Sequence, residues 1–379
     1  MTSENNDFRL LLHFDINKSI IMSDICSGRT MDQTLGSLLS ECTWGKYKDK
    51  PIDERTAEDW IICCDEPSCV EPELGTLTLG TYLEDHTLVP KKEQTRIKRA
   101  YTNTGSIGER FKPFHDKLDK SLQLDCDIEL QKQLPVLASG YYHIIPSFFR
   151  LIEYLADNNI EFNILFRTFG IDIENVCEEF NIFCSGKHPA YPLKHKLDGS
   201  DPKYPKDLRI VLPYFHGKIQ HTSSESSGLH MTYTSHDKVR EYTSSNTTTP
   251  TDTTITSGNS NCSSNSSDGS TTCHTHCAAI QDDFHWWHDI NNENEESGKL
   301  LLVDHTSNIQ SETEKKVIQM FFDDNIERDR AHIVDVRDWH SYASVPFSES
   351  KGLYLRRVEP YRAILERDYY IQEVVDVLQ

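Results

Sequence analysis

The sequence predicts an α/β fold, in which a parallel sheet of about five strands is covered by helices. Apolar runs of strand length alternate along the chain with segments of helical periodicity, and this alternation is typical of parallel sheets with right-handed crossovers. In addition, three polar residues, Asp15, Thr168 and Asp323, each fall at the end of a predicted strand. Ligands of such sheets bind at the carboxyl ends of strands, so these residues indicate where a site is expected.

The N-terminal part of the chain contains the first predicted strand. Residues 9–14 form an apolar run that stops at Asp15, as expected of a parallel strand buried on both faces. Residues 31–41 have apolar side chains at helical spacing and are predicted to form a helix. Residues 43–135 mix charge runs with short apolar pieces, which we interpret as an insertion with some hairpins and helices.

The pattern is more regular beyond this insertion. Residues 142–158 are predicted to form an amphipathic helix, with Pro146 in its first turn, where the missing N–H costs little. A strand is expected at 162–166, a helix at 171–184 and a third strand at 208–212. These elements continue the alternation of strand and helix.

The C-terminal part supplies the last two strands. They are predicted at 317–322 and 332–336, after a helix that extends from about 283 to 296. Residues 358–378 are predicted to complete the fold with a helix. Numbered along the chain, the strands are expected in the order 3-2-1-4-5, in a Rossmann-like three-layer arrangement.

A Ser/Thr-rich segment interrupts this pattern. Residues 243–273 contain one aliphatic residue, Ile255, among Ser, Thr, Asn and Gly. Such a segment cannot bury enough apolar area to offset the conformational entropy lost on ordering. We therefore predict a disordered loop within a low-complexity insertion that spans residues 222–277.

The composition restricts the expected partners and compartment. The formal net charge of -21 disfavours binding to nucleic acid and to anionic membranes. No stretch approaches the roughly 20 apolar residues that cross a bilayer, and the polar N-terminus does not resemble a signal peptide. We therefore expect a cytoplasmic protein that binds neither nucleic acid nor membranes, with its 11 cysteines mostly reduced.

Four motifs, taken in chain order, resemble those of haloacid dehalogenase-like (HAD-like) hydrolases. Residues 15–20, Asp-Ile-Asn-Lys-Ser-Ile, are similar to the D-x-D-x-T/S motif that follows a hydrophobic strand in this superfamily. Thr168 resembles the second motif, Lys299 the third, and Asp323 with Asp324 the pair of acids in the fourth. The subfamily is not identified by these motifs.

The resemblance divides the chain into a core and insertions. It covers residues 8–24 and about 140–340, and the remainder up to residue 379 is assigned to the same discontinuous core. Residues 25–139 correspond to a cap-like insertion, and caps largely determine substrate specificity in this superfamily. The low-complexity insertion lies within the core.

The resemblance implies a phosphatase or related phosphoryl-transfer enzyme acting on an unknown phosphorylated small molecule or phosphoprotein. Asp15 would be the nucleophile that forms an aspartyl-phosphate. Thr168 and Lys299 would bind the phosphoryl oxygens, with Arg167 as a further substrate-binding residue. A dianionic phosphate near carboxylates needs a counter-charge, so Mg²⁺ is the expected cofactor.

The expected magnesium ligands are hard oxygen atoms. They come from the side chains of Asp15 and Asp323 and from the backbone carbonyl of Asn17, with Asp324 in a supporting or alternative position. Two other lysines, Lys315 and Lys316, lie nearer to the fourth motif than Lys299 does, but they directly precede its strand.

Asn17 departs from the pattern of the superfamily, which usually has an acid at this position. That acid protonates the leaving group and then activates water, whereas an amide cannot titrate. A phosphotransferase, a slow hydrolase and a non-catalytic phosphate- or metal-binding interaction module all fit this substitution. A further alternative for the whole pattern is a flavodoxin-like fold with unrelated acids at its strand ends.

An aromatic group follows the low-complexity insertion. It consists of Trp286 and Trp287 between His285 and His288. We expect these tryptophans to anchor the chain on the sheet, and the alternative is a wall that contacts substrate beside the site.

Overall fold

The chain forms two compact units in the computed structural model. The sheet unit comprises Met1–Ile16, Leu151–Val358 and Glu373–Gln379, and the helical unit comprises Asn17–Arg150 and Glu359–Gln372. The structure describes residues 8–22, 28–210, 216–221, 229–235, 238–243, 255–256, 272–273, 276–305, 316–338 and 341–378. The predicted disordered segment falls largely outside these residues.

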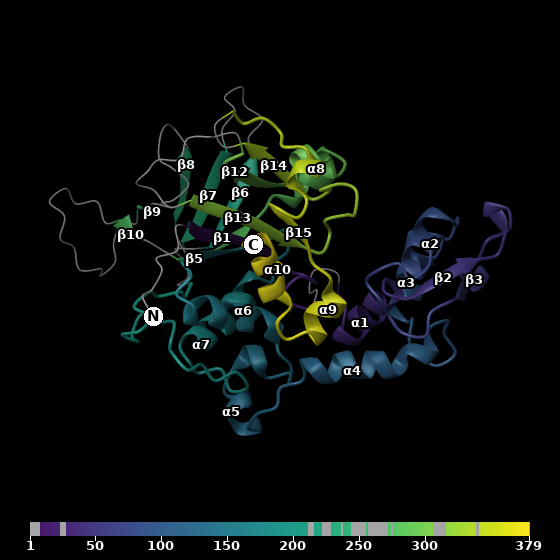
Figure 1. The fold of residues 1–379 in the computed structure, drawn as a ribbon, viewed down its shortest axis with the longest axis horizontal. Coiled ribbons are helices and arrows are strands. Elements are labelled where there is room, and N and C mark those ends of the chain that lie inside the picture. The colour runs from purple at the N-terminus through teal and green to yellow at the C-terminus, as the bar shows by residue number, and fades with distance from the viewer. Residues whose placement is uncertain are drawn as a thin grey trace. The chain divides into compact units, whose positions relative to one another are not determined.

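The sheet unit is built on an eight-stranded sheet (Figure 1). From β15 to β6 neighbouring strands are parallel, whereas β7 and β8 are antiparallel. The α/β class and the parallel sheet are thereby confirmed. In spatial order the strands are β15 (Leu355–Arg357), β13 (Lys316–Asp323), β1 (Phe8–Asp15), β5 (Phe162–Thr168), β11 (Cys277–Gln281), β6 (His216–His221), β7 (Leu229–Ser235) and β8 (Lys238–Thr243).

The centre of this sheet agrees with the prediction. β1 lies between β5 and β13, as expected for the first, second and fourth predicted strands. Phe14 of β1 is in register with Phe322 of β13, and their rings stack with centroids 4.6 Å apart. These rings are fully buried, and so is Phe321 on the opposite face of β13, as expected for strands that are covered on both faces.

The predicted third strand at 208–212 is wrong over its described part. Residues 208–210 are not a strand, because their backbone groups bond to a helix and a loop. The Asn181 side chain both donates to the Ile210 carbonyl and accepts from its N–H, and the Leu208 N–H donates to the Leu197 carbonyl. β11 occupies the place beside β5, so the predicted order 3-2-1-4-5 is also wrong.

The predicted fifth strand exists but belongs to another sheet. β14 (Val334–Asp338) pairs in parallel with β12 (Lys299–Val303), whereas the place beside β13 is taken by β15. Side chains from β12 and β14 share one buried core with Phe321 and Leu355 of the large sheet. The small sheet therefore covers one face of the large sheet, where helices were expected. A further pair of short strands is β9 (Ile255–Thr256) with β10 (Thr272–Cys273).

The helices predicted around the second strand are confirmed. α6 (Pro146–Asp157) begins at Pro146, and α7 (Ile173–Cys184) packs against β11. The helix expected from 283 to 296 is instead a π-helical turn, His285–Ile290, and a 3-10 turn, Glu295–Ser297. The expected C-terminal helix is divided into α9 (Pro360–Leu365) and α10 (Tyr369–Leu378), and α8 (Phe347–Ser350) is short.

The helical unit combines helices with a small antiparallel sheet in the order β3-β2-β4, formed by Trp60–Ile62, Trp44–Tyr47 and Leu77–Thr78. The predicted helix at 31–41 is confirmed as α1 (Met31–Ser40), which begins with a capping box between Thr30 and Gln33. A side chain at Gly36 would approach the Arg99 carbonyl to 2.7 Å, so glycine permits α1 to pack on α3. The other helices are α2 (Leu79–Asp85), α3 (Lys91–Arg99), α4 (Lys112–Leu122) and α5 (Ile128–Lys132), with 3-10 turns at Ile52–Glu54, Ala57–Asp59, Glu109–Phe111 and Pro135–Leu137.

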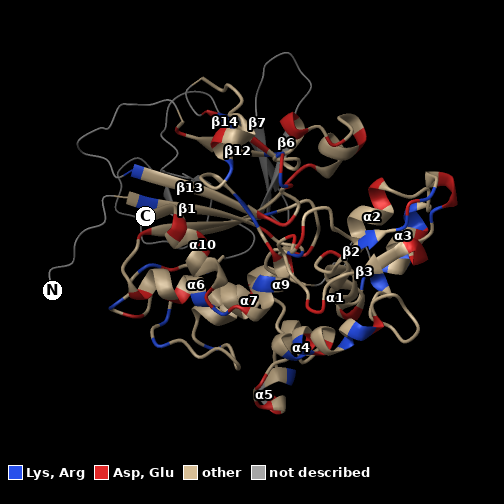
Figure 2. Ribbon diagram, turned by 45° about the vertical axis from the view of Figure 1, so that its right-hand side comes forward, with Lys and Arg blue, Asp and Glu red and all other residues tan. Residues whose placement is uncertain are grey.

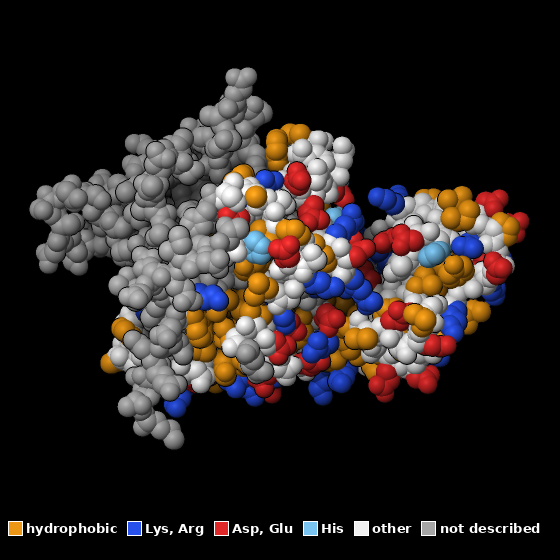
Figure 3. Space-filling model, turned by 45° about the horizontal axis from the view of Figure 1, so that its top comes forward, with side chains coloured by type: hydrophobic (Ala, Val, Ile, Leu, Met, Phe, Trp, Pro, Cys, Tyr) orange, Lys and Arg blue, Asp and Glu red, His pale blue; other side chains and the backbone are white. Residues whose placement is uncertain are grey.

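Opposite charges are interspersed on the surface of each unit. In Figure 2, the ribbon of α3 is coloured both blue for Lys and Arg and red for Asp and Glu, and Arg96 on this helix pairs with Glu93 at 2.6 Å. The face shown in Figure 3 likewise has acidic, basic and apolar side chains side by side. In these views, the acidic residues that the structure describes are therefore spread among basic ones and do not gather on one acidic face.

Candidate active site

The three predicted strand-end residues lie at one edge of the large sheet. Asp15 is the last residue of β1, Thr168 of β5 and Asp323 of β13. Because β1 is parallel to both neighbours, these strands end on the same side, which we call the carboxyl edge. All three side chains are buried.

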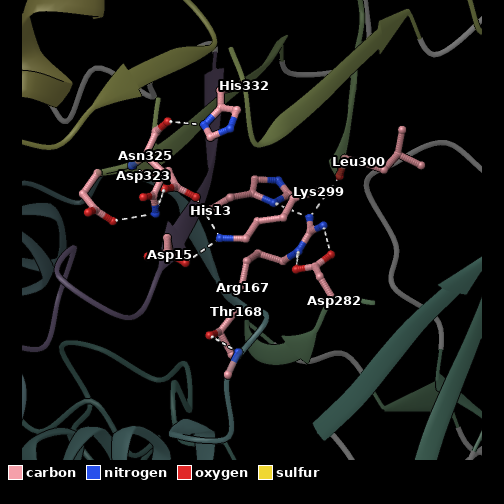
Figure 4. A network of polar contacts seen from close by, with 12 residues as sticks. His13, Asp15, Arg167, Thr168, Asp282, Lys299, Leu300, Asp323, Asn325 and His332 are labelled. Carbon is pink, nitrogen blue, oxygen red and sulfur yellow. Dashed lines mark hydrogen bonds and ion pairs between the residues drawn. The ribbon is translucent and has the colours of Figure 1, made fainter. Parts of the chain in front are cut away.

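Lys299 joins two of these residues. Its Nζ atom lies 2.5 Å from Oδ1 of Asp15 and 2.7 Å from Oδ2 of Asp323 (Figure 4). The lysine is the first residue of β12, where its N–H donates to the Ile333 carbonyl. Only 1% of Lys299 is exposed, so the two carboxylates replace water around its charge. We call Lys299, Asp15, Asp323 and Asp324 the lysine cluster.

The two other candidate lysines differ from Lys299 in their placement. Lys316 is the exposed first residue of β13, so it lies at the opposite end of this strand from Asp323. Lys315 lies outside the described residues. Lys299 is thus the motif candidate that contacts both acids of the carboxyl edge.

The acids outnumber the base in the lysine cluster. Carboxylate oxygens of Asp15, Asp323 and Asp324 lie within 4.8 Å of one another. The N–H of Asn325 donates to Oδ1 of Asp323 at 2.8 Å and fixes the orientation of this carboxylate. Three carboxylates around one ammonium leave an excess of negative charge, and their oxygens are the donors that a hard divalent cation requires.

Burial and charge act together on the lysine cluster. Burial raises the pKa of the Asp15 carboxyl well above its usual range, and the Asp323 carboxylate raises it further, whereas Lys299 acts in the opposite direction. Burial by itself would lower the pKa of the Lys299 ammonium, but the two carboxylates hold this pKa above its usual range. The cluster is therefore short of positive charge.

A second buried ion pair lies beside the lysine cluster. The Arg167 guanidinium binds Asp282 through two hydrogen bonds, at 2.9 and 2.5 Å, and donates to the Leu300 carbonyl at 3.0 Å (Figure 4). It also lies 3.4 Å from Nδ1 of His13. We call Arg167 and Asp282 the arginine pair. These contacts join β5 to β12, while the predicted role of Arg167 in binding substrate stays a prediction.

Thr168 and Asn17 are placed by their backbone surroundings. The Thr168 hydroxyl accepts from the Gly170 N–H at 2.8 Å, which orders the turn after β5. Asn17 is the first residue of the helical unit, where it forms an isolated bridge with Ile21. The roles expected of Thr168 toward phosphate and of the Asn17 carbonyl toward metal stay predictions.

Aromatic rings adjoin Lys299 within the sheet unit. The ring of Phe169 lies 5.2 Å from the Lys299 Nζ atom and stacks on Trp287, with centroids 5.1 Å apart. Phe284 meets Phe169 edge-on at 5.8 Å and is 44% exposed. Trp287 is buried in the core shared by the two sheets, so it anchors this segment as expected.

Asp282, His13 and Phe169 were not recognised as neighbours of the site from the sequence. Asp282 directly follows β11, a strand of five residues that has small side chains and begins at the end of the low-complexity segment. The position of an acid directly after a strand is the signal that points to Asp282, but it depends on a strand that the sequence pattern does not indicate. His13 precedes Asp15 by two residues and therefore lies on the same face of β1.

Comparisons with known proteins provide no further assignment. No protein-family profile, curated protein or solved structure matches the chain. Within the described residues, none of the helices combines the length and apolar character needed to cross a bilayer.

Proposed function

We propose that the chain is a phosphoryl-transfer enzyme with a Rossmann-like, HAD-like core in the sheet unit. The observation that carries the proposal is the lysine cluster: Lys299 lies between Asp15 and Asp323 at the carboxyl edge. Three motif residues that are far apart in the sequence, Asp15, Lys299 and Asp323, thus lie in one cluster. The fourth, Thr168, ends β5, the strand next to β1. Such an edge is where parallel sheets bind ligands.

Asp15 acts as the nucleophile in this proposal. Its carboxylate attacks the phosphorus of a phosphate monoester, the bond to the ester oxygen breaks, and an aspartyl-phosphate forms. Lys299 neutralises the phosphoryl oxygens as they approach and holds the Asp15 carboxylate in position through the 2.5 Å contact. Thr168, at the end of the neighbouring strand, donates to a phosphoryl oxygen.

The donor set of the lysine cluster fits Mg²⁺. Asp15, Asp323 and Asp324 offer carboxylate oxygens close to one another, and the single ammonium does not balance them. These residues would hold the ion, with the Asn17 carbonyl as a further ligand implied by the resemblance. Bound there, Mg²⁺ supplies charge neutralisation and orientation of the phosphate.

Two measurements test the proposal. Wild-type protein with Mg²⁺ is expected to hydrolyse phosphate monoesters and to bind beryllofluoride as an aspartyl-phosphate mimic, detected by fluorine NMR. Asp15→Asn is expected to lose both properties. Asp335→Asn, which changes a buried acid in β14, serves as the matched control and is expected to keep both. Equal turnover by wild type and Asp15→Asn contradicts the proposal.

A second candidate function is a phosphate- or metal-binding module without turnover. Asn17 favours it, because the residue two positions after Asp15 cannot supply or accept a proton. This alternative predicts that beryllofluoride or phosphate binds while no phosphate ester is turned over. Its phosphorylated ligand would be a small molecule or a phosphoprotein.

A further inference from the structure

We infer that the substrate is an aryl phosphate, a phosphate monoester of a phenol, whose ring contacts an aromatic wall beside Lys299. The inference rests on the proposed function and names the substrate class of the same site. Two independent observations carry it: the chemistry of Asn17 and the placement of Phe169, Phe284 and Trp287, which together form the aromatic wall.

The first observation concerns the leaving group. When Asp15 attacks phosphorus, the ester oxygen departs with the bonding electron pair. The motif resemblance would put an acid two residues after Asp15 to protonate that oxygen, and Asn17 cannot do so, which favours a leaving group that is stable as an anion. Phenols have a pKa of about 10, as tyrosine does. Aliphatic alcohols resemble water, with a pKa of about 16, so their esters depend much more strongly on a general acid.

The atoms and protons balance without a co-reactant other than water. The phenolate leaves and takes a proton from solvent. Water then attacks the phosphorus of the aspartyl-phosphate, loses a proton to solvent and releases inorganic phosphate, which restores the Asp15 carboxylate. Because the amide of Asn17 cannot activate water either, this second step is expected to limit turnover.

The second observation concerns the surface next to the phosphate. Phe169 directly follows Thr168, and its ring lies 5.2 Å from the Lys299 Nζ atom. Phe169 is packed against Trp287, whereas Phe284, 5.8 Å from Phe169, keeps 44% of its surface exposed. The wall thus begins at the phosphate-binding lysine and ends at an accessible ring.

The exposed ring is held in place by its neighbours. Phe284 stacks on His288 with centroids 4.8 Å apart and an angle of 17° between the rings. It precedes the π-helical turn His285–Ile290, which Trp287 anchors in the core. The part of this ring that His288 leaves exposed suits contact with a planar ring separated from phosphorus by one oxygen atom, and aromatic pairs add specificity beyond simple burial.

The kinetic test separates ring recognition from leaving-group chemistry. Phenyl phosphate has a ring and a good leaving group, benzyl phosphate has a ring and a poor one, and trifluoroethyl phosphate has no ring but a moderately good leaving group. Wild type is expected to have the highest kcat/KM for phenyl phosphate and to release phenol in a burst close to one equivalent per enzyme. Faster turnover of benzyl than of phenyl phosphate contradicts the leaving-group argument.

The variants test the wall. Phe284→Ala and Phe284→Leu are expected to lower kcat/KM for phenyl and benzyl phosphate by about three- to tenfold, the range of an aromatic pair, and to leave trifluoroethyl phosphate unchanged. Ile290→Ala, which alters an exposed side chain at the end of the same turn, is the matched control and is expected to change none of the three. An equal effect of Phe284→Ala on all three substrates overturns the inference.

A binding measurement keeps the inference separate from turnover. Phenylphosphonate and methylphosphonate have a carbon atom bonded directly to phosphorus and lack the ester oxygen that the substrate would lose. They are therefore not hydrolysed there, and calorimetry reports their affinities even if the protein has no activity. Tighter binding of phenylphosphonate, lost in Phe284→Ala, supports the wall, whereas equal affinities overturn it. Absence of turnover together with ring-selective binding contradicts only the proposed function.

The aryl phosphate has two possible sources, a small phenolic metabolite and a phosphotyrosyl side chain. Both present the same ring and ester oxygen to the wall. A higher kcat/KM for a phosphotyrosyl peptide than for phenyl phosphate indicates a protein substrate, and the reverse indicates a small molecule. A preference of the enzyme for phosphoserine over phosphotyrosine peptides contradicts the inference.

Discussion

The lysine cluster and the arginine pair differ in charge balance, although both are buried at the same region of the sheet unit. In the arginine pair, one guanidinium faces one carboxylate, and its further polar contacts are with the Leu300 carbonyl and His13, neither of which carries a negative charge. In the lysine cluster, one ammonium faces two carboxylates directly, and a third lies nearby. A buried group with more carboxylates than cations is costly. Such a group is typical of a site where a ligand supplies the missing positive charge.

This difference separates a structural ion pair from a candidate site. The arginine pair holds β5 against the strand that carries Lys299, and its hydrogen-bonding groups are used within the protein. The lysine cluster keeps carboxylate oxygens that a cation, and then a phosphate, would complete. Predictions that alter one member of either group test whether this distinction holds.

The largest expected effect on stability is that of Asp282→Asn. The substitution leaves the Arg167 guanidinium buried, with 2% of its surface exposed, beside an uncharged partner. Breaking a buried pair in this way is expected to lower the free energy of unfolding by about 3–5 kcal/mol. Urea denaturation measures the change, and Asp329→Asn at an exposed position is the control. A loss below about 1 kcal/mol contradicts the structural role of the pair.

The main expected effect of Lys299→Met is on catalytic activity. Loss of a preorganised charge at the phosphoryl oxygens is expected to lower kcat by about 10²- to 10³-fold. Lys316→Met, at the exposed start of β13, is expected to leave kcat unchanged. Steady-state kinetics on phenyl phosphate measures kcat for both variants. Equal effects of the two substitutions would contradict a role of Lys299 in phosphoryl transfer.

His13, which lies beside Arg167, is expected to make the stability of the fold depend on pH. Burial and then the Arg167 charge lower the pKa of His13 to about 3, whereas histidine in the unfolded chain titrates near 6.5. The folded protein therefore binds fewer protons than the unfolded chain between these values, and stability falls as pH decreases below 6.5.

The expected contribution of His13 is about 1–2 kcal/mol between pH 7 and pH 5. His13→Gln keeps a hydrogen-bond acceptor for Arg167 and removes the titration. The difference between the unfolding free energies of wild type and variant, measured across this range, cancels the other titrating groups. A difference that does not change with pH would show that the pKa of His13 is the same in the folded protein and in the unfolded chain.

Local patterns in the sequence were sufficient to predict which residues lie together at the carboxyl edge. Asp15, Thr168 and Asp323 each follow a buried apolar run, and a parallel sheet brings such ends together. The motif order indicates Lys299, and in the structure this lysine lies between two of these acids. These assignments depend on residues within single strands or on their order.

Features that depend on distant parts of the chain were not predictable in this way. The pattern of residues 332–336 indicates a strand but does not specify its sheet, and the strand found there, β14, pairs with β12 outside the large sheet. β11 has too few bulky side chains to be recognised after the low-complexity segment. In the helical unit, the buried hydrogen bond between Thr43 and Tyr101 joins residues that no local pattern relates.

The smallest expected effect on stability is that of Asp15→Asn. It has the opposite sign to the effect of Asp282→Asn and therefore tests the comparison most directly. Burial and the neighbouring Asp323 carboxylate raise the pKa of Asp15, so its ionised form is disfavoured in the folded protein. A raised carboxyl pKa means that this residue's contribution to stability is lost as pH rises through the folded value.

Asp15→Asn is therefore expected to abolish phosphoryl transfer and to increase the free energy of unfolding by about 1 kcal/mol at pH 7, as is common when a functional site is neutralised. The same chemical change, Asp to Asn, is thus expected to stabilise the protein in the lysine cluster and to destabilise it in the arginine pair. Urea denaturation of Asp15→Asn and Asp282→Asn without added metal measures both. If both variants lose stability to a similar extent, the lysine cluster is a balanced structural group, and its excess of acid no longer indicates a site.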